Sequence, residues 1–299
     1  MKLLAFISFI MVNISLVSCG NNPAAATDKD SFSVSNPFYA ESTLPFQAPD
    51  FSRIKNSDFE PALEAGMKQK LAGILQIENN PESPSFENTV HAMEKAGALL
   101  ERTSLVFNAL TGANTNPELQ RLQEAVAPRL AATEDAIYLN SKLFERVDTL
   151  YQQRDRLQLD SESLRLLEYY EQQFEMAGAK LTNSGKEELK KLNQEEASLK
   201  AQFTNRLLAA TRAGALVVSD SAALAGLPSG TVESAAQKAK ADQLSGKWVI
   251  SLQNTTQQPD LKFFSNRDTR QKLFEASWNR AEKKDTNDTR DLIIKLARL

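Results

Sequence analysis

Few side chains in the sequence can carry out nucleophilic, redox or metal chemistry. The 299 residues include one His and one Cys, whereas most hydrolytic, redox and zinc sites use several residues of these types. His91 is followed by Glu94, a spacing that can place an imidazole and a carboxylate on one side of a helix. That pair supplies only part of a zinc ligand set, so a helix-surface or hydrogen-bonded His beside an ordinary charge is the favoured interpretation.

Sequence motifs that carry catalysis are absent from the chain. His-Glu-x-x-His, Gly-x-Ser-x-Gly, Gly-x-x-x-x-Gly-Lys and Gly-x-Gly-x-x-Gly do not occur. The carboxylate pairs Glu187-Glu188 and Glu195-Glu196 have Lys residues three or four positions away, which is typical of ion pairs on a solvated helix face. We therefore assign no catalytic residue and no metal ligand from the sequence, and we expect no cofactor in this chain.

Four residues with large side chains could line a binding groove. They are Tyr169, Tyr170, Trp278 and Arg280. Aromatic residues at helical spacing more often belong to a core than to a groove, so a core position is favoured for the aromatic residues of this set. The residues that would bind a substrate remain unknown at this level.

The elements that must position these side chains are mostly helices. Hydrophobic residues make up 41% and charged residues 24% of the chain, with only 11 Gly and 11 Pro, which is typical of a soluble globular protein rich in helix. The net charge is -3, without the basic excess that phosphate contacts need, so nucleic acid is excluded as a partner. The composition thus predicts an all-α fold.

The first residues have the pattern of a lipoprotein signal peptide. Lys2 precedes an apolar run from Leu3 to Val17, which is too short to span a bilayer as a helix. The residues Leu16-Val17-Ser18-Cys19 resemble a bacterial lipobox, which predicts a signal peptide over residues 1–18 and a lipid on Cys19. An ordinary secretory signal that contains a Cys is the alternative.

The predicted lipid would anchor the chain to a membrane, on the periplasmic or cell-envelope side of a bacterium. Residues 19–35 lack periodicity and are predicted to form a tether. From residue 36 to 54 three Pro residues break any helix, so this segment is predicted to be an extended arm. Its apolar anchors would be Phe38, Leu44, Phe46 and Phe51.

Apolar residues at helical spacing predict the elements of the body. Helices are expected over residues 57–79, 85–112, 116–155, 161–176, 184–212, 267–284 and 286–299, with Pro128 kinking the third. The first would start with a capping box at Ser57, and Gly112 would end the second. Asn116 and Asp160 would start the third and fourth, and Gly178 or the turn over 181–183 would end the fourth. The helix over 184–212 is expected to form an antiparallel hairpin with the helix before it. Residues 215–218 and 247–252 are rich in β-formers and predict one small two-stranded ribbon, with a polar turn over 253–260.

Several separated phrases of the sequence resemble one family of peptidases. They include Asn36-Pro37-Phe38, Ala177-Gly178-Ala179-Lys180-Leu181 and Trp278-Asn279-Arg280-Ala281-Glu282-Lys283-Lys284. In order and spacing, residues 36–299 resemble the N-terminal half of a bacterial peptidyl-dipeptidase, or dipeptidyl carboxypeptidase, of the thimet-oligopeptidase-like zinc metallopeptidase family. The resemblance implies one multi-helix lobe of a two-lobed channel peptidase, which releases dipeptides from the C-terminus of short peptides.

The chain departs from that family at the catalytic centre. The family holds zinc with two His of a His-Glu-x-x-His helix and a further Glu, and a lone His91 cannot supply two such ligands. The pattern from Asp288 to Leu299 is helical with no residue that would stop it. We therefore expect a chain truncated before the zinc motif, inactive alone and lacking the C-terminal catalytic half as its partner. The alternative is a catalytically inert helical lipoprotein that acts as a peptide-binding or scaffold module.

Overall fold

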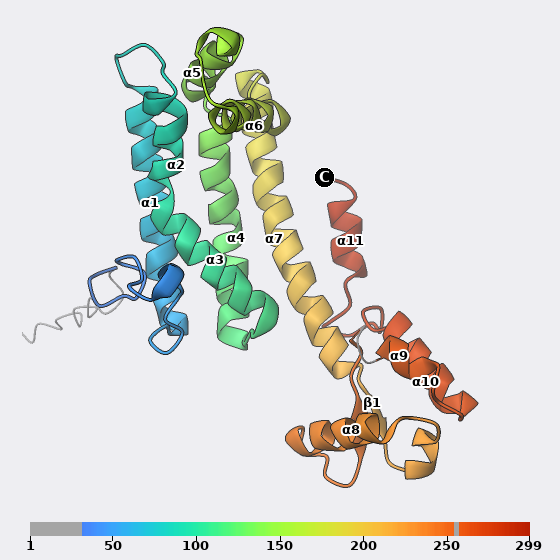
Figure 1. The fold of residues 1–299 in the computed structure, drawn as a ribbon. Coiled ribbons are helices and arrows are strands. Elements are labelled where there is room, and N and C mark those ends of the chain that lie inside the picture. The colour runs from blue at the N-terminus through green and yellow to red at the C-terminus, as the bar shows by residue number, and fades with distance from the viewer. Residues whose placement is uncertain (1–31, 254–256) are drawn as a thin grey trace, which may run out of the picture. The chain divides into compact units, whose positions relative to one another are not determined.

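The computed structural model describes residues 32–253 and 257–299, and within them helices dominate (Figure 1). The predicted signal peptide and Cys19 lie outside the described residues. The helices are α1 Phe59–Glu78, α2 Ala92–Ala96, α3 Ala98–Ala113, α4 Pro117–Tyr138, α5 Ser141–Gln152, α6 Ser161–Ala177, α7 Asn183–Ala213, α8 Ser229–Ala241, α9 Gln257–Leu261, α10 Arg267–Trp278 and α11 Arg290–Leu296. The strands are β1 Leu216–Val218 and β2 Trp248–Ile250. The all-α prediction with one small ribbon is confirmed for the described residues.

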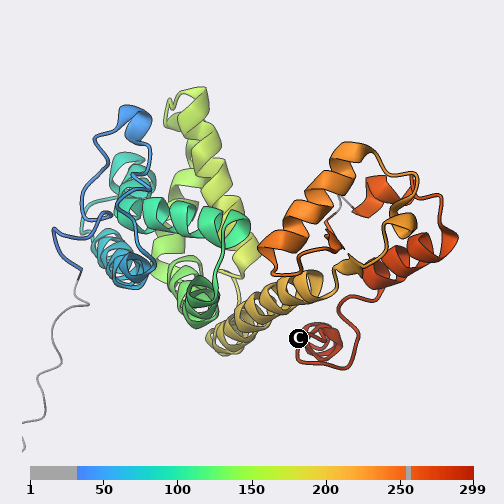
Figure 2. The ribbon, with the colours of Figure 1, turned by 90° about the horizontal axis from the view of Figure 1, so that it is seen from below.

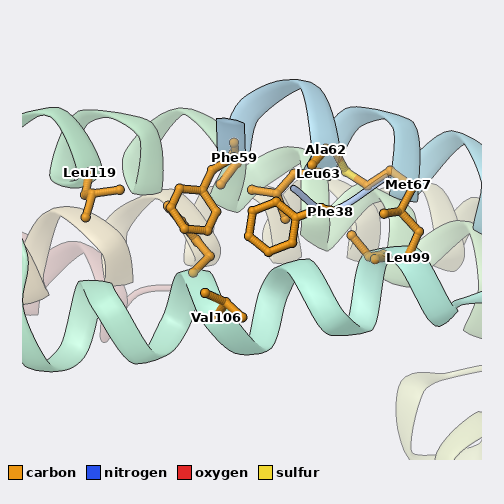
Figure 3. Packing of buried hydrophobic residues seen from close by; sticks show 11 residues of the cluster. Phe38, Phe59, Ala62, Leu63, Met67, Leu99, Val106 and Leu119 are labelled. Carbon is orange, nitrogen blue, oxygen red and sulfur yellow. The ribbon is translucent and has the colours of Figure 1, made fainter. Parts of the chain in front are cut away.

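The first core cluster joins the N-terminal arm to α1, α3 and α4. Phe59 is fully buried, and its ring lies 5.2 Å from the rings of both Phe38 and Phe107. Figure 3 shows the α1 and α3 side chains of this cluster facing one another. Phe32, which falls within the predicted tether, also packs against this cluster, so the packed body begins at least as early as that residue.

The second core cluster lies among α1, α4, α5 and α6. Phe174 is fully buried between the rings of Tyr138, 5.1 Å away, and Phe144, 5.7 Å away. Apolar side chains of α5 and α6 such as Val147 and Leu167 complete the cluster, each with no exposed surface. Burial of such large apolar side chains is the main source of stability for this part of the chain.

The third core cluster surrounds the ribbon. The strands pair antiparallel with Leu216 opposite Ile250 and Val218 opposite Trp248. Helix α8 packs on β2 and α10 packs on β1 (Figure 2). Leu273 of α10 is fully buried in this cluster, so two strands that would be marginal alone are held by helices.

The long helix α7 packs mainly along α4, not along α6 (Figure 1). The predicted hairpin with the preceding helix is therefore wrong. Polar side chains fix the α4–α7 contact, because Asn193 donates to Asp135 at 2.6 Å and Asn205 donates to the Gln120 carbonyl at 3.2 Å. On another side, α11 packs on α7. Contacts between distant parts of the chain thus decided the partner of α7.

Two helices predicted as continuous are each divided in two. The segment over 85–112 forms a π-helical turn at Glu87–His91 and then α2, and it breaks at Gly97 before α3. The segment over 116–155 breaks after Tyr138, because Asn140 caps α5 by accepting the Leu143 amide at 3.0 Å. Gly112 lies inside α3 and does not end it, since a helical Gly ends a helix only where the backbone turns away.

Several helix ends agree with the sequence. Asn116 caps α4, and Asp160 caps α6 by accepting the Ser163 amide at 2.8 Å. Gly178 ends α6 in the left-handed conformation with φ 95°. The capping box predicted at Ser57 is wrong, because Asp58 instead accepts the Lys55 amide at 2.7 Å. A short polar side chain can accept a hydrogen bond from any of several nearby backbone amides, and the tertiary structure determines which of these bonds forms.

Other expectations fail at short elements. Phe38 anchors the arm as predicted, but Leu44, Phe46 and Phe51 are exposed. A short helix, α9, occupies part of the predicted polar turn. Helix α10 ends at Trp278 instead of residue 284, and α11 ends at Leu296. In each case the local pattern covers too few residues to compete with tertiary contacts.

Candidate functional site

A pocket of about 430 Å³ lies where α1, α2, α3, α4 and α6 meet, and we call it the tyrosine pocket. Its volume is in the range of small-ligand sites, which is roughly 300–1,000 Å³. Its lining residues are Lys70, Ile74, Met93, Glu94, Gly97, Leu100, Glu101, Ser104, Leu130, Glu134, Ile137, Tyr138, Tyr169 and Tyr170. The pocket therefore combines an apolar surface with three tyrosines and three carboxylates.

The apolar surface of the pocket is built from core side chains. Ile74, Met93, Leu100 and Ile137 are each at least nine-tenths buried. The break between α2 and α3 brings the chain close to α1, where a Cβ on Gly97 would lie 3.4 Å from the Lys70 side chain. A Cβ at this position would be in ordinary van der Waals contact with the stem. The pocket can thus take an alkyl chain against a firm surface.

The tyrosines lie at the more polar part of the lining. Tyr170 donates its hydroxyl to the Glu94 carboxylate at 2.5 Å. The rings of Tyr169 and Tyr170 meet nearly edge to face, with centroids 5.6 Å apart and planes at 72°. Tyr138 is half-buried, and its ring and the ring of Phe174 in the second core cluster pack edge to face. Helix packing therefore fixes the rings of Tyr138 and Tyr170.

Burial and nearby carboxylates keep these hydroxyls protonated. Burial raises the pKa of Tyr138 to about 12, and the Glu134 charge adds to the rise. The pKa of Tyr170 is raised further, first by burial and then by its hydrogen bond to Glu94. Both hydroxyls are therefore neutral donors at physiological pH, and the negative charge of the pocket resides on its carboxylates.

The charged side chains of the lining are unequal in number. Glu94, Glu101 and Glu134 stand against one cation, Lys70, so the formal charge of the lining is -2. The Lys70 ammonium lies 3.6 Å from the Glu134 carboxylate. The tyrosine pocket thus already holds one alkylammonium group and keeps an excess of negative charge.

His91 is not part of this pocket. Its Nδ1 lies 2.5 Å from a Glu87 carboxylate oxygen, and its side chain is 41% exposed. Glu94, the proposed neighbour of His91, is bonded to Tyr170 instead. Within residues 32–253 and 257–299, no group of three or more His, Cys, Asp or Glu side chains is arranged to hold a metal. His91 thus lies at a partly exposed helix position beside the charge of Glu87.

The remaining sequence candidates are separated by the fold. Tyr169 and Tyr170 line the tyrosine pocket, whereas Trp278 and Arg280 do not. Trp278 is 77% exposed and stacks on Phe274 with centroids 5.7 Å apart, so the core position favoured for Trp278 is wrong. The predicted ion pairs on α7 are confirmed by Lys190 with Glu187 and by Lys200 with Glu196, each at 2.7 Å.

The charged and aromatic residues of the pocket that sequence reasoning missed are Lys70, Glu101, Glu134 and Tyr138. The only signal for the last two is their spacing of four residues on one helix, which puts both side chains on one face of α4. Nothing in the sequence indicates that this face meets Glu94 and Tyr170.

Comparison with known proteins places the chain among peptidases. No family model matches it. It is 50% identical over 264 residues to the dipeptidyl carboxypeptidases of Escherichia coli K12 and of Salmonella typhimurium. It is also 21% identical over 243 residues to oligopeptidase A of Escherichia coli K12. The match to each dipeptidyl carboxypeptidase covers 88% of this chain and 39% of that protein.

Half of the 264 aligned residues are identical, and this degree of similarity confirms the resemblance noted in the sequence. The residues of the tyrosine pocket and the buried residues around it therefore lie in a chain that is similar to two peptidases, dipeptidyl carboxypeptidase and oligopeptidase A, and that spans 39% and 36% of their lengths.

Proposed function

We propose that this chain is the N-terminal part of a zinc peptidyl-dipeptidase that releases dipeptides from the C-terminus of short peptides. The observation that supports the proposal is the 50% identity over 88% of the chain to dipeptidyl carboxypeptidase. Because the match covers 39% of that relative, the remaining part of the enzyme would supply the groups that cleave the peptide bond.

The donor set of this chain does not fit a catalytic zinc ion. The sequence has one His, and this His91 lies beside Glu87 at a partly exposed position. Catalytic zinc sites in proteins use three protein ligands, commonly two or more of them His. We therefore derive no catalytic step from these residues, and we propose that a C-terminal half carries the zinc.

We propose that the C-terminal catalytic half packs on the exposed apolar surface of α10 and α11. Phe274, Trp278, Ile293 and Ile294 are each at least half exposed. Large apolar side chains in such numbers favour contact with another protein surface. The relatives are more than twice as long as the matched segment, so their remaining chain is the proposed occupant. Alone, the 299-residue chain should self-associate through this surface.

A chimera tests the proposed activity. The chain is joined to the part of the Escherichia coli dipeptidyl carboxypeptidase that the match does not cover, and release of dipeptides from a short peptide is measured. We expect dipeptide release that a chelator abolishes, one equivalent of zinc in the chimera, and neither property in the 299-residue chain alone. An inactive, folded chimera, or zinc-dependent cleavage by the chain alone, would contradict the proposal.

We further propose that Cys19 carries a lipid that anchors the protein to a membrane at the periplasmic or envelope side of a bacterium. The support is the order of a charged residue, a short apolar run and Leu16-Val17-Ser18-Cys19. Within the part of the chain that the structure describes, no helix is long and apolar enough to cross a bilayer. The proposed anchor is the acyl chains on Cys19.

Fractionation of bacterial cells tests this anchor. Cys19→Ser should move the protein from the membrane fraction to the soluble fraction and abolish labelling by a radioactive fatty acid. Ser18→Ala, which leaves the Cys in place, is the control and should stay in the membrane. Membrane association that persists in the Cys19→Ser variant would identify the apolar run itself as the anchor.

A catalytically inert lipoprotein that binds peptides is the second candidate. The observation that favours it is the tyrosine pocket, which is complete within this chain. Sequencing the DNA after the codon of Leu299 separates the two candidates. An in-frame continuation with His-Glu-x-x-His supports the peptidase, whereas a stop codon followed by unrelated sequence supports the binding module.

A further inference from the structure

The tyrosine pocket has the chemistry of a site for an organic cation. Its lining carries three carboxylates, one ammonium and three tyrosine rings. The faces of aromatic rings attract cations, and the attraction grows where water is excluded. Since the two most buried tyrosines stay neutral, the excess charge that a ligand meets is the negative charge of the carboxylates.

The shape of the pocket adds a requirement for an alkyl chain next to the cation. Met93 and Leu100 are 5% exposed, Ile137 is 2% exposed, and all three lie in the lining. A small inorganic cation would leave this apolar surface in contact with water. A Lys or Arg side chain would cover it, because these side chains join a cationic head to an apolar stem.

Lys70 shows how such a group is held within the chain itself. Its stem passes beside Gly97, and its ammonium lies 3.6 Å from Glu134. Glu94 lies on a different helix, and the Tyr170 hydroxyl fixes its carboxylate. A carboxylate oriented by a hydroxyl donor is ready to accept a second ammonium or guanidinium without reorganisation.

We infer that the tyrosine pocket binds the basic side chain of a peptide, with its Lys or Arg head beside Glu94 and the rings of Tyr169 and Tyr170, and with its stem against Met93 and Leu100. That the cation belongs to a peptide rests on the proposed function. No residue of this chain is proposed to cleave the peptide bond. The pocket therefore acts in peptide binding, and it selects peptides with a basic residue.

Binding of two matched small probes to the purified 299-residue chain tests the inference. The probes are N-acetyl-lysine amide and N-acetyl-norleucine amide, which share the linear alkyl stem and differ in the ammonium group. Isothermal titration calorimetry should show that the lysine probe binds about tenfold or more tightly than the norleucine probe. Equal affinities, or no binding of the lysine probe, would overturn the inference.

Charge-neutral variants locate the binding. Glu94→Gln keeps the shape of the side chain and an acceptor for Tyr170, and it should weaken the lysine probe about tenfold without changing the norleucine probe. Tyr169→Leu should weaken the lysine probe severalfold. Glu188→Gln, on the exposed face of α7, removes the same charge elsewhere and should leave both affinities unchanged. An equal loss in Glu94→Gln and Glu188→Gln would show attraction by net charge alone and overturn the assignment.

The probes also separate this inference from the proposed function. Neither probe has a peptide bond that a dipeptide-releasing enzyme cleaves, so their binding does not depend on a catalytic half. A chimera that releases dipeptides from basic and neutral peptides at equal kcat/KM would refute peptide selection by the pocket while leaving the peptidase proposal intact. An inactive chimera with intact lysine binding would refute the peptidase proposal only.

Discussion

The helical bundle, residues 56–213, and the ribbon region, residues 214–299, bury their apolar side chains in different ways. The bundle uses long helices whose apolar faces are buried in the first two core clusters. The ribbon region uses two three-residue strands and short helices around the smaller third cluster, and it leaves Phe274 and Trp278 exposed. Long amphipathic helices can bury their own apolar faces against each other, whereas short elements depend on further partners.

The largest expected effect is the loss of a bundle core ring. Phe59→Ala removes a fully buried side chain that contacts two other rings, and it should lower the free energy of unfolding by about 3–5 kcal/mol. Phe46→Ala is the control, because Phe46 is fully exposed, and it should change stability by less than about 0.5 kcal/mol. Urea denaturation followed by circular dichroism measures both values. Equal effects would show that the arm packs differently in solution.

The next effect tests whether the two regions unfold separately. Leu273→Ala opens a cavity in the third cluster and should cost about 2–5 kcal/mol. Hydrogen exchange should then rise in α8, β1, β2 and α10 while α1 and α4 keep their protection. A uniform rise in exchange over all of these elements would mean that the two regions form one cooperative unit.

A pair of Gly variants within the bundle has smaller effects of opposite sign. A Cβ on Gly66 would lie 2.8 Å from the Leu100 Cα. Gly66→Ala should therefore push α1 away from α3 and lower the free energy of unfolding by about 1–3 kcal/mol. A Cβ on Gly112 meets no atom within 4 Å, so Gly112→Ala should stabilise α3 by about 0.5–1 kcal/mol. Thermal unfolding of both variants measures the difference. A stabilising Gly66→Ala would refute the close α1–α3 packing.

The smallest effect is a pH dependence at the α4–α7 contact. Burial raises the pKa of Asp135 above its ordinary value of 3.8, so the folded state binds its proton more tightly than the unfolded state. Stability therefore falls as pH rises from about 4 through the folded pKa. Asp135→Asn cannot ionise and still accepts a hydrogen bond from Asn193, so it should lose this decline and gain stability relative to the native chain as pH rises through that window.

Asp160 provides the opposite case. The Ser163 amide that donates to its carboxylate is the main cause that holds the pKa of Asp160 below 3.8. Its contribution to stability is present above that value and is lost as pH falls through the folded pKa. Denaturation curves of Asp135→Asn and Asp160→Asn between pH 2 and 7 should thus diverge from the native chain in opposite directions. Parallel curves would contradict the burial of Asp135.

The sequence predicted the type of nearly every long element but not where the chain breaks between them. Asn116, Asp160 and Gly178 mark helix ends correctly because their preferences are local. The breaks at Gly97 and Asn140 were missed because the apolar spacing continues across them. A continuous pattern allows either one helix or two, and the choice depends on which neighbours the two segments contact.

The candidate site was only partly within reach of the sequence. Tyr169 and Tyr170 were candidates because aromatic pairs can line a groove, but their role depends on Glu94, Tyr138 and Glu134. These residues lie on three helices, and a helical pattern gives the face of each helix without its partner. The pairing of His91 with Glu87 instead of Glu94 was also missed, although their spacing of four residues is usual for ion pairs on a helix.

By itself, the sequence determined the helical class, the small ribbon and the similarity to dipeptidyl carboxypeptidase, since periodicity and recurring phrases are properties of the chain alone. The tertiary structure alone decided that α7 packs on α4, that three predicted arm anchors face solvent, and that three tyrosines and three carboxylates meet in one pocket. The physical reason is that burial and electrostatic contacts act between residues distant in sequence, and their energies exceed the local preferences that a pattern records.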